Sequence, residues 1–295
     1  MSTVAILGPG AIGSIFGVRL CLLERHDVVV CVRKPFEKFS VEAPSGTIES
    51  PVRCITDPAE ASPVDWVLLA VKCHQVKDVS PWLRALAGPG TIIAVLQNGV
   101  EYLENVSPYA HGAEVLPVVV RCPADRLGPG RVVQNAHAEL VPPEGEAGRA
   151  LAELYEGSDI PVSPTADFVT AKWKKLCGNI ARGPATALTG RGRGVVRNPE
   201  IAEFCRALVQ ECAEVGRAEG ADLPEDFVDR VVSDQYGAEE DATTSMLVDL
   251  RAGRPIEADG MTGAVVRIGA RHGIDTPINR MVNALLLEIN SGGPK

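Results

Sequence analysis

The stretch Thr3–Gly13, TVAILGPGAIG, decides the fold of this 295-residue chain. It opens with the short apolar run Thr3–Leu7, which predicts a buried β-strand. Three glycines then fit the pattern G-x-G-x-x-G, and a helical periodicity follows over Ala11–Arg25. A lone glycine pattern is weak evidence, but its place between a strand and a helix makes it specific. We therefore predict a Rossmann-type dinucleotide-binding unit at this end of the chain.

Each glycine in this stretch has a physical role in such a unit. Gly8 permits the tight turn, Gly10 leaves room for a pyrophosphate against the backbone, and Gly13 lets the helix pack closely on the sheet. The amides of the first helical residues, Ala11 and Ile12, can donate hydrogen bonds to phosphate. A glycine-rich loop without a ligand is the alternative, and the complete strand–turn–helix–strand unit argues against it.

The end of the second predicted strand, Asp27–Val32, indicates which dinucleotide is bound. An acidic residue there would accept a hydrogen bond from the ribose 2′-hydroxyl of NADH, whereas an arginine accommodates the 2′-phosphate of NADPH. Arg33 and Lys34 follow the strand, and no acid occurs before Glu37. We therefore predict NADPH as the cofactor, the alternative being two solvated surface charges.

The rest of the chain divides into a strand-rich part and a helical part. The apolar runs Asp65–Val71 and Thr91–Leu96, with a helical pattern at Val76–Leu86 between them, indicate a parallel sheet covered on both faces. Helical patterns then dominate at Phe168–Leu188, Glu200–Glu219, Pro224–Val232, Met246–Ala252, Met261–His272 and Ile278–Ile289. The predicted fold class is α/β. A Rossmann-type doubly wound sheet occupies residues 1–165 and binds NADP, and an all-helical substrate and catalytic domain follows over residues 166–295.

Composition argues against several classes of protein. The chain has 29 basic and 38 acidic residues, a net charge of −9, which disfavours binding to nucleic acid. Its eight cysteines are scattered, without a C-x-x-C pair or a histidine at metal-ligand spacing, so we expect reduced thiols and no metal site. The sequence does not open like a signal peptide, and its apolar runs are too short to span a bilayer. We expect a soluble, cytoplasmic protein.

With these features in place, the sequence resembles the ketopantoate reductase (2-dehydropantoate 2-reductase) family from Ala5 to about Pro277. The motifs that carry the resemblance are GPGAIGS, Val71-Lys72, Leu96-Gln97-Asn98-Gly99, Ala124 with Gly128-Pro129-Gly130, Trp173-x-Lys175-Leu176-x-x-Asn179, Ser245-Met246, and Glu257-x-Asp259 with Gly263. Two of these, LQNGV and W-x-K-L-x-x-N, are fairly specific together. A β-hydroxyacid dehydrogenase also pairs a Rossmann domain with a helix lysine, and LQNGV favours the ketopantoate reductases over it.

The resemblance implies which residues meet the cofactor. Lys72 and Asn98 would lie by its nicotinamide end, and Ala124 would contact it through the backbone. Glu257 would support the substrate or the cofactor. The alternative for Glu257 is an acid placed at a helix N-terminus, where the helix macrodipole favours negative charge.

The resemblance also implies a catalytic group and its neighbours. Lys175 would be the general acid, with Asn98 beside it, and Asn179 and Ser245 would hold the substrate. Hydride arriving at a carbonyl carbon leaves negative charge on oxygen, which a nearby proton donor must neutralise. Lys175 and Asn179 are spaced i,i+4 and share one helix face. The alternatives are a solvated lysine patch and, for Ser245, a plain helix-start residue.

Three positions depart from the family pattern: Gly183, Ala242 and Thr262 stand where the family often has asparagine. Each change removes a polar group expected near the substrate, so the chemistry is better defined than the substrate. The resemblance implies reduction of a 2-keto acid to a 2-hydroxy acid with NADPH, with ketopantoate to pantoate, a step of pantothenate biosynthesis, as the leading reaction. A related reductase for another 2-keto acid and a non-catalytic NADPH sensor are the alternatives, and Lys175 argues against the sensor. The physiological pathway and the oligomeric state stay open, a homodimer included.

Overall fold

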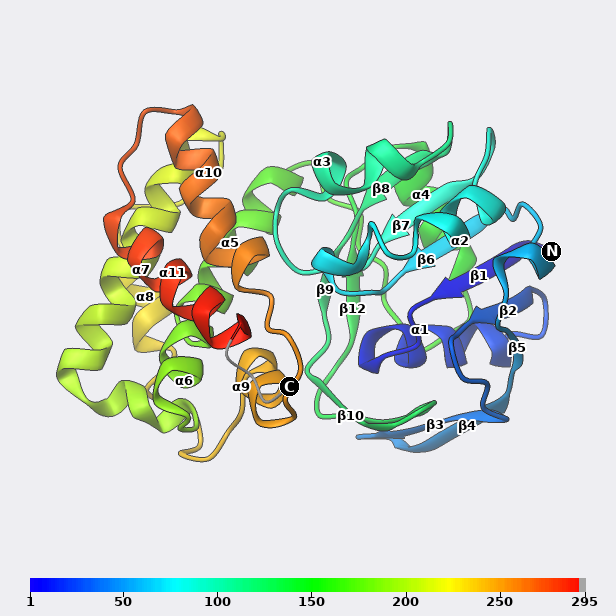
Figure 1. The fold of residues 1–295 in the computed structure, drawn as a ribbon, viewed down its shortest axis with the longest axis horizontal. Coiled ribbons are helices and arrows are strands. Elements are labelled where there is room, and N and C mark those ends of the chain that lie inside the picture. Colours follow the sequence, from blue (N-terminus) through cyan, green and yellow to red (C-terminus); the bar gives the residue numbers. More distant parts are fainter. Residues whose placement is uncertain (292–295) are drawn as a thin grey trace. The chain divides into compact units, whose positions relative to one another are not determined.

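The computed structural model describes residues 1–291 and contains two compact units (Figure 1). The first unit consists of residues 1–97 and 101–168, and the second of residues 98–100 together with residues 169–291. The short segment Asn98–Val100, which follows the fifth strand of the main sheet, therefore packs with the helical unit.

The first unit is built on a six-stranded sheet in which every neighbouring pair of strands is parallel. The strand order is β5-β2-β1-β6-β7-β8, which is the 3-2-1-4-5-6 order of the Rossmann fold. The strands are β1 (Thr3–Leu7), β2 (Asp27–Cys31), β5 (Arg53–Ile55), β6 (Trp66–Leu69), β7 (Ile92–Val95) and β8 (Glu114–Pro117). The predicted Rossmann-type sheet is confirmed.

Further strands and four helices surround this sheet. The helices are α1 (Ala11–Leu22), α2 (Ser80–Leu86), α3 (Tyr102–Val106) and α4 (Glu146–Leu154). A second sheet has the order β10-β11-β3-β4, and a two-stranded pair joins β12 to β9. These strands are β3 (Lys38–Ala43), β4 (Gly46–Pro51), β9 (Val119–Arg121), β10 (Ala124–Gly128), β11 (Arg131–Gln134) and β12 (Glu139–Val141). Buried Phe16 of α1 shares one core with Ile6 of β1 and Phe39 of β3, so α1 packs between the two sheets.

The second unit is helical. Its helices are α5 (Phe168–Ile180), α6 (Gly183–Thr189), α7 (Pro199–Ala218), α8 (Phe227–Ser233), α9 (Ser245–Arg251), α10 (Ala264–Arg271) and α11 (Pro277–Ser291), with a π-helical turn at Asp259–Gly263 before α10. One core joins Trp173 of α5, Leu208 and Cys212 of α7, Val265 of α10 and Leu286 of α11, all of them buried. The predicted all-helical C-terminal part of the fold is confirmed.

Two predicted helices are wrong in their extent, and proline is the physical reason in both. The helix predicted over Phe168–Leu188 is divided into α5 and α6, because Pro184 has no amide proton and is suited only to the first turn of a new helix. The helix predicted over Val76–Leu86 begins only at Ser80, and Pro81 lies in its first turn.

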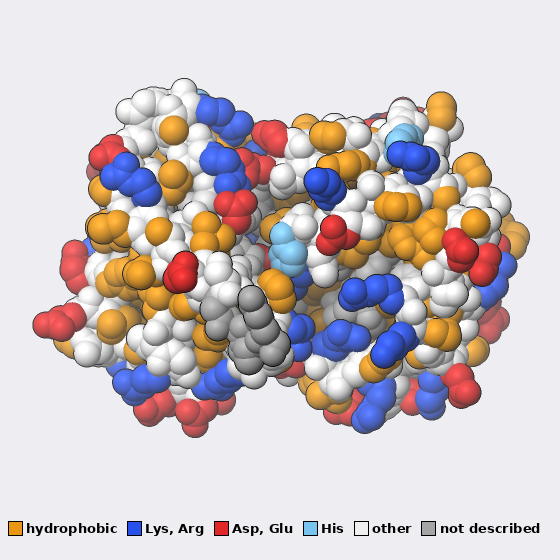
Figure 2. Space-filling model, in the orientation of Figure 1, with side chains coloured by type: hydrophobic (Ala, Val, Ile, Leu, Met, Phe, Trp, Pro, Cys, Tyr) orange, Lys and Arg blue, Asp and Glu red, His pale blue; other side chains and the backbone are white. Residues whose placement is uncertain are grey.

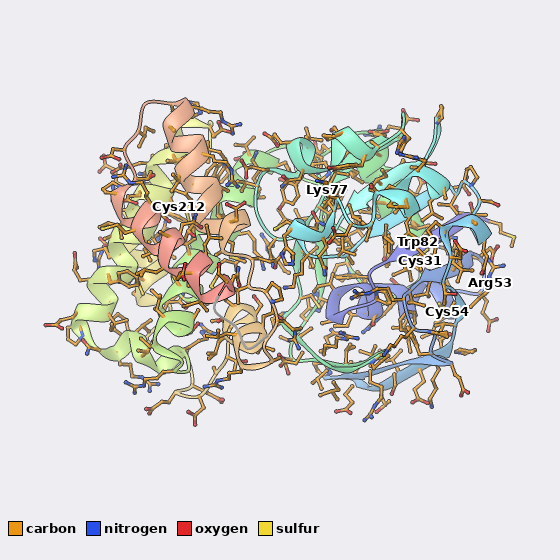
Figure 3. All side chains as sticks on the ribbon, viewed as in Figure 1. Cys31, Arg53, Cys54, Lys77, Trp82 and Cys212 are labelled. Atoms are coloured by element: carbon orange, nitrogen blue, oxygen red, sulfur yellow. The ribbon has the colours of Figure 1, made fainter. Side chains whose placement is uncertain are left out.

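None of the eight cysteines forms a disulfide, and Cys31, Cys177, Cys205 and Cys212 are buried as small apolar side chains. Cys31 and Cys54 lie on the neighbouring strands β2 and β5 (Figure 3), and burial raises the pKa of the Cys31 thiol to about 12. Cys212 of α7 lies 3.4 Å from Cys177 of α5, sulfur to sulfur. Among residues 1–291, no helix is both long and apolar enough to cross a bilayer.

Candidate functional site

The glycine loop between β1 and α1 has the geometry that dinucleotide binding needs. Gly8 has a φ of +95°, and a Cβ there would lie 2.6 Å from Cγ1 of Val71, so the position accepts only glycine. At Gly10, by contrast, no described atom lies within 4 Å of the place that a Cβ would occupy. No side chain of the described residues caps the start of α1, which leaves its first amides available as donors. The loop therefore has room for a phosphate and groups that can bind it.

Positive side chains accompany this loop. Arg33 and Lys34 follow β2 after one residue, Val32, and both are exposed. Figure 2 shows several Lys and Arg side chains grouped over the area that α1 occupies in Figure 1. Although the whole chain is acidic, this face of the first unit carries the charge that suits a phosphorylated ligand.

Lys72 and Ala124 lie in loops and strand ends of the same unit. Lys72 is half-buried, and its backbone amide donates to Oε1 of Gln75 at 3.1 Å at the start of a short 3₁₀ turn after β6. The buried Gln97 donates from Nε2 to the carbonyl of Val71 at 2.8 Å, so it ties the end of β7 to the end of β6. Ala124 is the half-buried first residue of β10.

Three predicted site residues meet in one polar network in the second unit. Nδ2 of Asn98 donates to Oε2 of Glu257 at 3.0 Å, and Nδ2 of Asn179 approaches Oδ1 of Asn98 at 3.5 Å. Glu257 is buried, with 5% of the residue exposed, and it directly precedes the helical segment that begins at Ala258, so a place at a helix N-terminus also describes it. The sequence places Asn98 and Glu257 159 positions apart, and the fold joins them.

Lys175 and Ser245 lie on separate helices of this unit. Lys175 is half-buried on α5, one turn before Asn179, whereas its neighbour Lys174 is exposed. Ser245 is the exposed first residue of α9. The residue that caps this helix is Thr244, whose Oγ1 accepts from the amide of Leu247 at 3.1 Å. Ser245 therefore does not serve as the N-cap.

Two arginines beside the network were not identified from the sequence. Nη2 of Arg182 lies 3.5 Å from Oδ1 of Asn179, and burial together with the nearby charge of Arg193 lowers the pKa of Arg182 to about 10. Nη2 of Arg193 donates to Oε1 of Gln235 at 3.0 Å. The available signal was a cation placed directly before Gly183-Pro184, at the end of a largely apolar helix.

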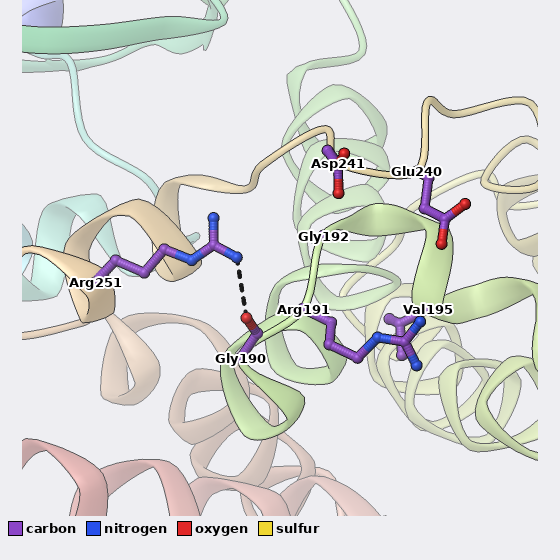
Figure 4. A pocket seen from close by; sticks show the side chains of 7 residues that line it. All are labelled: Gly190, Arg191, Gly192, Val195, Glu240, Asp241 and Arg251. Atoms are coloured by element: carbon purple, nitrogen blue, oxygen red, sulfur yellow. Dashed lines mark hydrogen bonds between the residues drawn. The ribbon is translucent and has the colours of Figure 1, made fainter.

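A shallow pocket of about 220 Å³ opens beside the segment that contains Arg193 (Figure 4). Its lining residues are Gly190, Arg191, Gly192, Val195, Glu240, Asp241 and Arg251. Nη2 of Arg251 donates to the carbonyl of Gly190 at 3.0 Å. Two acids and two arginines share this pocket, and none of the predicted site residues lines it.

The fold and these residues define a dinucleotide-binding oxidoreductase. It has a Rossmann sheet with an open glycine loop, and a polar network next to a half-buried lysine. Within the described range, no three His, Cys, Asp or Glu side chains cluster in a way that could hold a metal ion. Comparison with known proteins identifies the family.

Residues 4–146 match the family described as "Ketopantoate reductase PanE/ApbA", and residues 167–290 match "Ketopantoate reductase PanE/ApbA C terminal". The chain is 42% identical to the 2-dehydropantoate 2-reductase of Caulobacter vibrioides, over 97% of this chain and 98% of that one. It is 37% identical to the enzyme of that name from Mycobacterium tuberculosis, over 98% of both chains. A solved ketopantoate reductase of the PanE/ApbA family from Ralstonia eutropha superposes with a TM-score of 0.88, at 30% identity and 98% coverage of both chains.

The chain belongs to the ketopantoate reductase family, and the resemblance seen in the sequence is confirmed. It is an oxidoreductase that acts on the CH–OH/C=O pair with an NAD(P) cofactor. A non-catalytic sensor, one alternative from the sequence, does not fit this membership.

Proposed function

We propose that this enzyme reduces a 2-keto acid to the 2-hydroxy acid with NADPH, and that ketopantoate, which gives pantoate, is its leading substrate. The observation that carries the proposal is the position of Lys175, half-buried and one helical turn from the Asn98–Asn179–Glu257 network. The identity of 42% to a 2-dehydropantoate 2-reductase supports the choice of substrate.

The first unit, predicted as residues 1–165, is proposed to bind NADPH. Gly8, Gly10 and Gly13, with the amides of Ala11 and Ile12, would hold the pyrophosphate. The open space at Gly10 and the uncapped start of α1 support this assignment. Bound NADPH would supply the hydride.

The exposed Arg33 would pair with the 2′-phosphate through charge-assisted hydrogen bonds. Lys72, Asn98 and Ala124 would contact the nicotinamide end of the cofactor, and Glu257 would support cofactor or substrate from the second unit.

The second unit, predicted as residues 166–295, is proposed to hold the substrate and supply the proton. Lys175 would protonate the oxygen that becomes negative as hydride reaches the carbonyl carbon. Asn179 and Ser245 would hold the substrate. Glu257, through its hydrogen bond from Asn98, would keep that amide in one orientation. Because the lysine is half-buried, its charge acts in a medium less polar than water.

A second candidate is reduction of a different 2-keto acid. Gly183 and Ala242 supply no polar side chain, and the hydroxyl of Thr262 already bonds to the carbonyl of Ala258 at 3.1 Å and to Oδ1 of Asn283 at 3.0 Å. The experiment that decides is NADPH oxidation, followed with ketopantoate and a panel of other 2-keto acids. A kcat/KM for ketopantoate well above that for the panel supports the first candidate, and a clear preference for another acid supports the second.

Two further properties belong to this proposal. A ketopantoate reductase from Staphylococcus aureus, 27% identical with a TM-score of 0.87 over 98% of this chain and 99% of that one, is described as dimeric. We propose a homodimer here as well, to be tested by sedimentation. Eight cysteines without a disulfide fit a reducing compartment, so a cytoplasmic location is proposed.

A further inference from the structure

The charges of Arg182 and Arg193 are close enough to repel each other, and the printed side-chain contacts of the two, to Asn179 and to Gln235, include no acid among the described residues. Burial and mutual repulsion both disfavour such a pair, and both effects lower the pKa of Arg182. Both residues are half-buried, and a charge that loses part of its hydration is stabilised by a partner of opposite charge. The two guanidinium groups therefore have the electrostatics of a site for an anion.

The hydrogen bonds of both arginines are also incomplete. The one described contact of the Arg182 side chain is to Oδ1 of Asn179 at 3.5 Å, which is long for a hydrogen bond. In Arg193, Nη2 donates to Gln235 at 3.0 Å, but the buried Nε has no partner in the described structure. A guanidinium carries five N–H donors, so most of this capacity is unused.

The backbone and a buried amide fix the position of Arg193. Its amide donates to the carbonyl of Ala242 at 2.8 Å. The side chain of Gln235 is oriented in turn by its Nε2, which donates to the carbonyl of Val231 at 2.9 Å, and this leaves its oxygen facing Arg193. Arg193 thus contributes a second positive charge, held in place near Arg182.

We propose that Arg182, with the charge of Arg193 near it, binds the carboxylate of the keto-acid substrate. The inference rests on the proposed function and deepens it. The network runs from the carboxylate of Glu257 through Asn98 and Asn179 to the guanidinium of Arg182. A 2-keto acid would place its carbonyl oxygen toward Lys175 and its carboxylate toward the Arg182 guanidinium, which contacts Asn179, the residue one helical turn after Lys175. A planar guanidinium matches a carboxylate with two parallel hydrogen bonds.

This assignment explains how the site can lack an amide at position 183. Gly183 offers no side-chain donor, and the preceding residue, Arg182, supplies a charged one. Recognition by charge differs from recognition by an amide in one measurable way, since it depends on the substrate being an anion. A neutral ester or lactone of the same keto acid should lose that part of the binding.

The test compares an anionic substrate with its neutral form. The unmodified enzyme, Arg182→Leu and Arg182→Lys are assayed with ketopantoate and with its lactone, in which the carboxylate is closed into an ester. For Arg182→Leu we expect kcat/KM for the acid to fall about 10- to 100-fold, mainly through KM, with the lactone changed less than about threefold. Arg182→Lys should recover part of the loss, and Arg193→Gln should show a smaller loss of the same selectivity. Equal losses for acid and lactone would overturn the proposal.

An equilibrium measurement separates this inference from the proposed reaction. Pantoate binding is followed by calorimetry for the unmodified protein, Arg182→Leu and the control Arg251→Leu, whose arginine is exposed in the pocket of Figure 4. We expect binding to be lost only in Arg182→Leu.

If the protein binds pantoate through Arg182 but reduces no keto acid, the proposed reaction is wrong and the anion site stands. If it reduces ketopantoate and Arg182→Leu binds pantoate normally, the anion site is wrong and the reaction stands. Absence of pantoate binding by the unmodified protein overturns the inference.

Discussion

The side-chain amide of Asn98 donates to the buried carboxylate of Glu257, with 3.0 Å between Nδ2 and Oε2. Asn98 follows the last residues of the Rossmann strand β7, yet it packs with the helical unit. Within the motif LQNG, Gln97 thus belongs to the first unit, whereas Asn98 belongs to the second and forms part of its polar network.

Replacing Asn98 by aspartate should destabilise the protein more than replacing an asparagine on the exposed surface by aspartate. Two carboxylates would then face each other in a buried site, where like charges repel strongly and Glu257 loses a donor. We expect the free energy of unfolding, measured with urea, to fall by about 1–3 kcal/mol. The matched control is Asn135→Asp, because Asn135 also donates to a carboxylate, Asp125, at 2.8 Å, but on the exposed surface. A smaller loss in Asn98→Asp than in the control would contradict the buried pairing.

The two glycines of the loop should separate folding from cofactor binding. Gly8→Ala forces a Cβ against Val71 at a φ of +95°, so its melting temperature should drop by several degrees. Gly10→Ala enters open space, so the melting temperature should change little while NADPH binding weakens at least about tenfold, through the steric block to the pyrophosphate. Differential scanning fluorimetry and fluorescence titration measure the two effects. If Gly10→Ala bound NADPH normally, the phosphate would not lie there.

Arg33 should decide the preference for NADPH. Arg33→Ala removes a charge-assisted contact to the 2′-phosphate, so the Kd for NADPH should rise about 10- to 100-fold while the Kd for NADH stays within about twofold. Arg53→Ala is the control, since Arg53 is an exposed arginine of the same unit that pairs with Asp27 at 2.8 Å. An equal loss of affinity for both cofactors in Arg33→Ala would show that the residue does not recognise the phosphate.

The pH dependence of stability should reveal the ion pair between Arg19 and Asp159. Arg19 is buried, and its hydrogen bonds at 2.9 Å to both oxygens of Asp159 hold the pKa of that carboxyl below its usual range. A depressed carboxyl pKa stabilises the fold above the unfolded pKa of about 4, and this stabilisation disappears as pH falls through the folded value. Asp159→Asn should therefore unfold about 1–2 kcal/mol more easily at pH 7, the half-exposed acid limiting the effect. Urea curves of both proteins should converge in strong acid. If the difference in unfolding free energy between the two proteins did not change with pH, the ionised carboxylate of Asp159 would not be its cause.

The main sheet could be predicted from the sequence because its strands are short apolar runs with a clear local pattern. The runs Val4–Leu7 and Trp66–Val71 are apolar throughout, as is typical of buried parallel strands. Strands β3 and β4 were missed because they are half-exposed and carry charges such as Lys38 and Glu49, which pair on the surface at 2.7 Å. Their position depends on packing against α1, which is a tertiary contact that no local pattern encodes.

Some residues of the candidate site could likewise be predicted from the local sequence, and others could not. The glycine loop could be predicted because strand, turn and helix are contiguous in the chain. Lys175, Asn98 and Glu257 depended on the family resemblance, since an isolated lysine or acid carries no local signature. Arg182 and Arg193 were missed as a candidate anion site. Their spacing in the sequence shows neither that the fold brings them close together nor that no acidic partner is described for them.

The central claim is that Lys175 protonates the developing alkoxide. The most direct measurement is kcat for the reduction of ketopantoate by Lys175→Ala, compared with Lys174→Ala on the same helix, whose side chain is exposed. We expect Lys175→Ala to lower kcat by about 10²–10⁴-fold with the Kd for NADPH nearly unchanged, and Lys174→Ala to stay within about threefold of the unmodified enzyme. Similar small effects of both substitutions on kcat would contradict it.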